Sequence, residues 1–192
     1  RKPEVASAIS EVVGQVQAIA QVYGLQVGAG GPLRLKAVVE AISLSVQRTF
    51  GRAIQLAVEG PLAGDWQLPE AESIPIALSL NELLTNAHKH GVGMQSLRCV
   101  MAATEQGVRI DIRSPGRLPE GFSLDRVPGG VSGLGLVRAL LPRRSAKLSI
   151  LQDSEDVLTR LELIPPGILL LPPTTAPIAS EPTGHQTSLW PQ

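Results

Sequence analysis

The sequence predicts an α+β fold in which helices cover one face of a β-sheet. Residues 3–26 repeat apolar side chains at three- and four-residue steps, which is typical of a helix. "AIQLAVEG" (53–60) alternates apolar and polar residues like a strand. Two pairs of alternating segments follow, "MQSLRCVMAAT" with "GVRIDIRS" and "AKLSILQD" with "DVLTRLELI", each around a short turn. This order of elements favours a two-layer α/β sandwich.

Three more helices complete the predicted order, at about 33–49, 71–90 and 134–141. The first helix is long and carries a β-branched apolar stripe, so we expect it to pack against other helices. The stripe consists of Val5, Ile9, Val12, Val13, Val16, Ile19, Ala20 and Tyr23.

Composition excludes several classes of protein. The 192 residues are 43% hydrophobic with a formal net charge of zero, so charge gives no reason to expect nucleic acid as a partner. The single Cys99 excludes an intrachain disulfide and a multi-cysteine zinc site, which favours a reducing, cytoplasmic compartment. No apolar run approaches the roughly 20 residues of a membrane span, so we expect no membrane contact here.

Three segments differ in character. Residues 1–30 form the long helix, residues 31–164 hold the α+β pattern, and residues 165–192 are rich in Pro, Thr and Ser with Glu181 as their one charge. We expect this last segment to be disordered or loosely laid on the surface. Because the chain opens with Arg1 rather than Met, we expect it to begin within a longer protein that could be membrane-attached elsewhere.

The helix at 71–90 carries a polar stripe. With Glu82 at zero, Asn86 falls at about +40°, Lys89 at about −20° and His90 at about +80° around the helix axis. An acid, an amide and two cations in this order suit a magnesium–phosphate ligand: an amide oxygen binds Mg²⁺, the cations offset phosphate charge, and the acid accepts a proton or orients a water. The core face lies opposite and consists of Ile76, Leu80, Leu83, Leu84 and Ala87.

A plainer interpretation stays open from spacing alone. The same residues suit a solvated helix face whose last-turn cations complement the macrodipole before a terminating Gly91. His88 falls off the stripe, and we expect it on the surface.

Two glycine segments bear on this choice. "IDIRSPGRLPEGF" (110–122) ends a strand in a Pro/Gly turn, and "GGVSGLGLVRALL" (129–141) places Gly133 and Gly135 at the start of a helix. Glycine lets backbone N–H groups approach an anion, and a helix N-terminus favours phosphate. Alone, "GLGL" is equally typical of tight strand–helix packing.

Together these segments resemble the GHKL ATPases, most closely the catalytic domain of sensor histidine kinases. "NELLTNAHKHG" resembles the Asn box of that family, "SPGRLPEGF" its first glycine box and "SGLGLVRALL" its second, over roughly residues 34–164. The resemblance implies a Bergerat sandwich that binds ATP and Mg²⁺, with Glu82 catalytic and Asn86 on the metal. The implied nucleotide-binding residues are Asn86, Lys89, His90, Ser114, Gly116, Gly133, Leu134 and Gly135.

The upstream stretch "ISEVVGQVQAIAQVYGLQ" is similar to the second helix of the dimerisation and phosphoacceptor hairpin in the HisKA-2-like group. This implies a homodimer through the N-terminal helix and a response-regulator receiver domain as partner. The chain's histidines are His88, His90 and His185, none of them on the first helix. The implied phosphoacceptor would therefore precede Arg1.

The chain departs from the family pattern at two points. Ser114 stands where the first glycine box usually has the Asp that binds adenine, and strand alternation places Asp111 on the opposite face. The lid at about 120–132 is short, with Phe122 as its one aromatic. The expected function is therefore a protein-histidine kinase. The alternative is a degenerate GHKL domain that dimerises and docks a partner without using ATP. An anti-sigma-factor-type Ser kinase is a third interpretation, which the long first helix disfavours.

Overall fold

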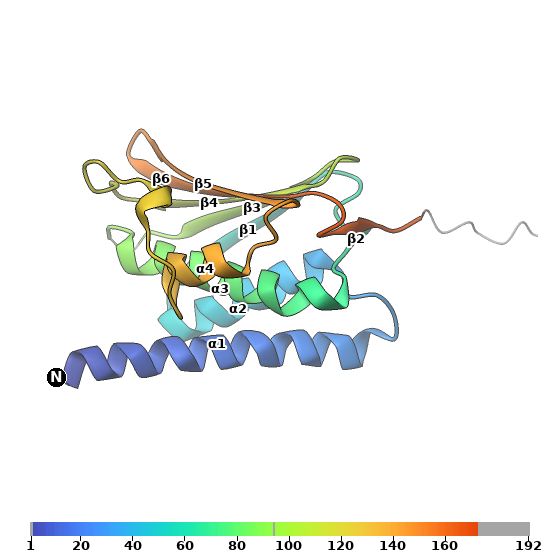
Figure 1. The fold of residues 1–192 in the computed structure, drawn as a ribbon, viewed down its shortest axis with the longest axis horizontal. Helices are drawn as coiled ribbons and strands as arrows, with labels where there is room; N and C mark the ends of the chain where they lie inside the picture. Colours follow the sequence, from blue (N-terminus) through green and yellow to red (C-terminus); the bar gives the residue numbers. More distant parts are fainter. Residues whose placement is uncertain (1, 94, 173–192) are drawn as a thin grey trace, which may run out of the picture.

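The computed structural model describes residues 2–93 and 95–172, and it is the α+β sandwich that the sequence predicts. Figure 1 shows a β-sheet whose one face is covered by α2, α3 and α4, with α1 running along the far side of these helices. The helices span Lys2–Ala29 (α1), Leu35–Phe50 (α2), Glu70–His90 (α3) and Gly133–Leu140 (α4), with a short 3-10 turn at Leu124–Arg126.

The main sheet has five strands in the order β1-β3-β4-β6-β5. β1 pairs with β3 in parallel, and the other neighbours are antiparallel, so the sheet is mixed. A two-stranded sheet pairs β2 with β7. The strands span Ile54–Glu59 (β1), Trp66–Gln67 (β2), Leu97–Ala103 (β3), Val108–Pro115 (β4), Ala146–Asp153 (β5), Asp156–Leu163 (β6) and Leu169–Leu170 (β7).

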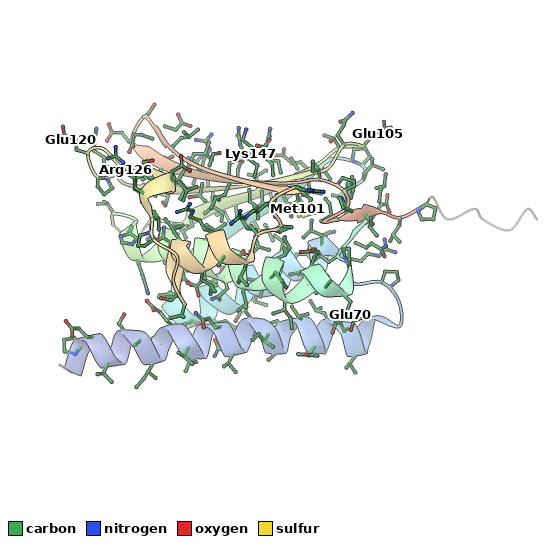
Figure 2. The ribbon with its side chains drawn as sticks, viewed as in Figure 1. Glu70, Met101, Glu105, Glu120, Arg126 and Lys147 are labelled. Atoms are coloured by element: carbon green, nitrogen blue, oxygen red, sulfur yellow. The ribbon has the colours of Figure 1, made fainter. Side chains whose placement is uncertain are left out.

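The core lies between the main sheet and the helices. In Figure 2, Met101 lies between these layers, whereas Lys147 lies on the other face of the sheet. The predicted inner face of α3 is buried as expected, because its apolar side chains meet the sheet and α2. This face consists of Ile76, Leu80, Leu83, Leu84 and Ala87.

The C-terminal end of α3 is tied to the end of β4. Val92 N–H donates to the Pro115 carbonyl at 2.7 Å, just after α3 ends. Gly116 adopts φ +151°, and a Cβ there would lie 3.2 Å from the His90 carbonyl oxygen. The positive φ and the close approach both favour glycine, and the contact joins the polar stripe of α3 to the first glycine segment.

The apolar stripe of α1 is largely exposed within the single chain, so a helix that packs on this stripe, as expected, would have to come from a second copy. Val12 and Val16 are 58% and 60% exposed, and Tyr23 is 56% exposed. The helix instead contacts the domain through its opposite, less apolar face, where Ala18 and Val22 are buried. Among the described residues, no helix is long and apolar enough to cross a membrane.

The expectation that residues 165–192 lie outside the fold is wrong for residues 165–172. Ile168 is fully buried, and the Leu171 N–H donates to the Asp65 carbonyl at 2.9 Å. β7 also pairs with β2, which holds the fully buried Trp66. Removing the chain from Pro165 onward would therefore take away part of the packed structure. Residues 173–192 lie outside the described residues.

Candidate functional site

Glu82 connects three elements around the polar stripe. Its side chain is 4% exposed. One carboxylate oxygen accepts a 2.8 Å hydrogen bond from the N–H of Gly133, the first residue of α4, and the other accepts a 3.1 Å bond from Nε2 of Gln15 on α1. The Gln15 amide also donates to the Val131 carbonyl in the lid at 3.0 Å. The Asn-box helix, the second glycine segment and α1 therefore meet at one carboxylate.

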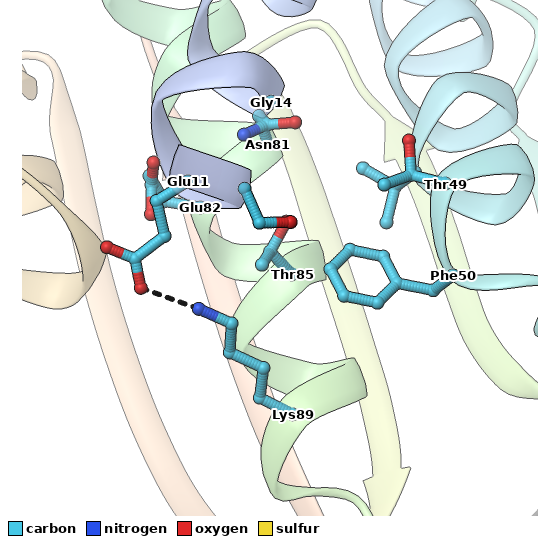
Figure 3. A pocket seen from close by; sticks show the side chains of 10 residues that line it. Glu11, Gly14, Thr49, Phe50, Asn81, Glu82, Thr85 and Lys89 are labelled. Atoms are coloured by element: carbon cyan, nitrogen blue, oxygen red, sulfur yellow. Dashed lines mark hydrogen bonds and ion pairs between the residues drawn. The ribbon is translucent and has the colours of Figure 1, made fainter. Parts of the chain in front are cut away.

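Lys89 lies two turns further along α3 and is bound by α1. Its ammonium is 2.6 Å from the Glu11 carboxylate, as the dashed line in Figure 3 shows. The hydrogen bond from Lys89 lowers the pKa of Glu11, and a bond from Ser132, just before α4, acts in the same direction. The cation predicted to meet phosphate is thus already paired with a carboxylate.

The amide predicted to bind metal lies between these two contacts. Asn86 is one helical turn beyond Glu82 and is half-buried. The described part of the chain holds no group of three or more His, Cys, Asp or Glu side chains placed so that they could bind a metal ion. Mg²⁺ at Asn86 would therefore take its remaining ligands from water and phosphate, which is its usual preference. His90, the last residue of α3, is exposed.

The start of α4 has the features of an anion-binding turn. Gly133 adopts φ +61°, and its N–H points at the Glu82 carboxylate. Gly135 is buried, and a Cβ there would lie 2.5 Å from the Pro128 carbonyl oxygen and 2.7 Å from the Gly130 nitrogen. The backbone of the lid thus packs directly on Gly135, while Leu134 packs against the core.

Ser114 and Asp111 lie on opposite faces of β4, as expected. Ser114 is buried on the face that meets the helices, in line with Ile110 and Ile112. Asp111 is on the other face, where Arg160 binds it with bonds of 2.7 and 2.8 Å. This pairing gives Asp111 a structural role in the sheet and leaves Ser114 as the polar side chain at the end of β4 that faces the helices.

His88 is not a surface residue, contrary to expectation. It is buried and stacks on Phe50 with ring centroids 5.1 Å apart. Burial lowers its pKa to about 4, and the nearby Arg52 charge acts in the same direction. His88 is thus a neutral core residue behind the stripe.

The structure brings the polar stripe and the glycine segments together, and α1 contacts the stripe at Glu82 and Lys89. The cavity beside Glu82 lies between α1, α2 and α3, with Asn81, Thr85 and Lys89 in its wall (Figure 3). Its volume of about 20 Å³ is room for roughly one water. This cavity is too small for a nucleotide, and its lining includes neither Asn86 nor the two glycine segments.

Sequence reasoning missed Glu11 and Gln15, which contact Lys89 and Glu82. Neither belongs to the apolar stripe of α1, and nothing in their spacing relates them to α3. The one available signal is the pair of small residues on the same face, Gly14 and Ala18, because small residues let two helices approach closely. A Cβ at Gly14 would lie 3.5 Å from the Asn81 side chain.

No family model and no curated protein matches the sequence. The fold, however, matches solved histidine kinase structures. The catalytic domain of histidine kinase ThkA superposes with a TM-score of 0.55 at 17% identity, covering 70% of this chain and 94% of that one.

Similarity extends to a blue-light-activated histidine kinase of Erythrobacter litoralis. Its histidine kinase domain gives a TM-score of 0.59 at 18% identity, covering 80% of this chain and 74% of that one. A longer structure of the same kinase gives a TM-score of 0.62 at 21% identity. This match covers 82% of this chain and 49% of that one. The chain therefore has the fold of a sensor histidine kinase catalytic domain.

Proposed function

We propose that this chain is the ATP-binding catalytic part of a two-component sensor histidine kinase. The observation that supports it best is the bond from Gly133 N–H to Glu82, because it places a negative group at the start of α4, directly beside the polar stripe. A helix N-terminus with glycine at its first position is suited to phosphate. The fold shared with histidine kinase catalytic domains supports the same proposal.

Each residue of the site has a distinct task in this proposal. Asn86 holds Mg²⁺ through its amide oxygen, and Lys89 and His90 offset phosphate charge. Gly133, Leu134 and Gly135 supply backbone N–H groups, since glycine allows close approach. Ser114, beside Gly116, accepts a hydrogen bond from the base. When bound, Mg-ATP supplies the phosphoryl group, and Glu82 orients or deprotonates the accepting group.

The accepting histidine belongs to a segment upstream of Arg1 in this proposal, and a response-regulator receiver domain is the partner that would take the phosphoryl group onward. Helix α1 joins two copies into a dimer. Support for the dimer comes from its exposed stripe: Val5, Ile9, Val12, Val16 and Tyr23 recur at three-, four- and seven-residue steps, the pattern of a helix–helix seam.

The test of the proposal is Mg-dependent nucleotide binding, which is measured by titration with a fluorescent ATP analogue. Asn86→Ala should weaken binding in Mg²⁺ at least tenfold. It should leave the temperature of thermal unfolding unchanged, because the half-buried side chain lies on the polar stripe and not on the core face of α3. Asn86→Asp keeps an oxygen ligand and should retain most of the metal-dependent affinity. Unchanged affinity in Asn86→Ala would overturn the metal assignment.

One observation favours the degenerate docking module as a second candidate. The hydroxyl of Ser114 is a weaker hydrogen-bond acceptor than the carboxylate that usually binds adenine in the GHKL ATPases, the family that the sequence resembles. Ser114→Asp should tighten binding of adenine nucleotides if this residue faces the base. If neither the wild type nor Ser114→Asp saturates up to millimolar Mg-ATP, the docking module is the better description.

A further inference from the structure

We propose that α1 is an intramolecular competitor of the nucleotide: its polar face docks on the phosphate-binding residues and must leave before a triphosphate can bind. This inference rests on the proposed function of the site. It assigns the surface formed by Glu82, Lys89 and the start of α4 a second occupant, which is the Glu11–Gln15 turn of α1.

The contacts of α1 fall on the residues that a phosphate would need. Glu11 pairs with Lys89 at 2.6 Å, so a carboxylate neutralises the cation of the stripe. Gln15 binds Glu82 at 3.1 Å and the lid carbonyl of Val131 at 3.0 Å, which joins the lid to α3 through α1. Glu82 in turn accepts the Gly133 N–H. The Glu11 carboxylate thus occupies the position where a phosphate would find the Lys89 cation. The Gln15 amide ties Glu82, and through it the start of α4, to the same helix.

The neighbouring face of α1 suggests how this contact can be released. At about 100° per residue, Glu11 and Gln15 each lie about 100° around the helix from Val12 and Val16, the stripe residues that follow them. A second copy that takes the stripe therefore contacts a face adjacent to the docked one, and it can shift the helix. Because linkage is reciprocal, any partner that draws α1 away should raise nucleotide affinity, and nucleotide should favour that partner.

The first test uses charge-matched variants of α1 in the same Mg-ATP titration. Glu11→Gln and Gln15→Ala should each tighten apparent affinity about threefold or more, because more molecules have an open site. Glu4→Gln makes the same change of charge on an exposed part of α1 and should have no effect. Gln26→Ala removes the same side-chain amide about three turns further along α1 and is the matched control for Gln15→Ala.

The second test holds α1 in place by a covalent link. Gln15→Cys with Val131→Cys, joined by a short bifunctional thiol reagent, should lose nucleotide binding at least tenfold compared with the same protein capped by a monofunctional reagent. Gln17→Cys with Thr49→Cys fixes α1 to α2 without touching the lid and should also block binding. The native Cys99 does not interfere, because it is buried and its burial raises the thiol pKa to about 12.

The outcomes separate this inference from the proposed function. If the linked proteins bind nucleotide as tightly as the capped ones, or if Glu11→Gln and Gln15→Ala match their controls, the competition by α1 is overturned while nucleotide binding stands. If no variant binds Mg-ATP up to millimolar concentration, the proposed function is overturned and the inference with it.

Discussion

The helices α1 and α3 lie against each other, yet they use their faces in opposite ways. α3 buries its apolar face between the sheet and α2, so its polar stripe faces α1 and the lid. α1 contacts the domain with a face of Gly14, Gln15, Ala18 and Val22 and leaves its valine stripe exposed. α3 is therefore held along a whole apolar face, whereas α1 joins the core through Ala18 and Val22 and adds a few polar contacts. This difference supports the proposal that α1 is the element that moves.

The largest expected effect compares a buried apolar residue of α3 with an exposed apolar residue of α1. Leu80 on α3 is 1% exposed and Val16 on α1 is 60% exposed. Leu80→Ala should lower the free energy of unfolding by about 2–5 kcal/mol through lost burial and a cavity. Val16→Ala should change it by less than about 0.5 kcal/mol in the monomer. Denaturant titration at concentrations too low for self-association measures both. Equal losses would show that the stripe around Val16 is packed in the monomer.

The next effect is a pH dependence that arises from the buried end of α3. Because the pKa of His88 is about 4 in the folded chain and about 6.5 when unfolded, the unfolded state takes up the proton first on acidification. The free energy of unfolding therefore keeps the full contribution of neutral His88 above pH 6.5. It loses this contribution as the pH falls toward 4, by at most about 1.4 kcal/mol per pH unit.

Denaturant titrations between pH 8 and pH 4 check this dependence. His88→Gln should flatten the pH profile, whereas His90→Gln, an exposed residue two positions along the same helix, should leave it as in the wild type. A profile that persists unchanged in His88→Gln would show that other groups cause it.

The sequence predicts the fold and the inner face of α3 because both depend on local periodicity. The strands, their turns and the α3 residues Leu80 and Leu84 follow from two- and 3.6-residue repeats, which act over a few neighbours. Strand alternation likewise places Asp111 and Ser114 on opposite faces. The motifs that resemble those of the GHKL ATPases add the candidate site residues of α3 and α4, because their order and spacing match that pattern.

The parts that sequence reasoning missed depend on contacts between distant segments. A valine stripe shows that one face of α1 is apolar, but it does not show whether the same chain or a second copy covers that face. Glu11 and Lys89 are 78 positions apart, and their pairing follows from the placement of α1 on α3 alone. His88 is misassigned for a similar reason, because Phe50 comes from another helix to cover it.

The third effect concerns self-association through the exposed stripe. Val12→Glu with Val16→Glu should weaken the proposed dimer at least tenfold, because two buried apolar side chains at a seam contribute about 1.5–3 kcal/mol each. Sedimentation velocity over a range of concentrations measures this change. Ala20→Glu, at the margin of the stripe, should have a smaller effect. A wild-type chain that remains monomeric up to high micromolar concentration would contradict the proposed dimer.

The smallest effect is the contribution of the Glu11–Lys89 pair to stability. The two side chains are 27% and 35% exposed, so water and salt screen their attraction, and pairs of this kind contribute about 0.2–1 kcal/mol. A double-mutant cycle with Glu11→Ala, Lys89→Ala and the combined variant should give a coupling of about 0.5 kcal/mol that shrinks in high salt. Such a value is small enough for a bound triphosphate to overcome. A coupling of several kcal/mol would make α1 a permanent part of the site, because the nucleotide could not displace it.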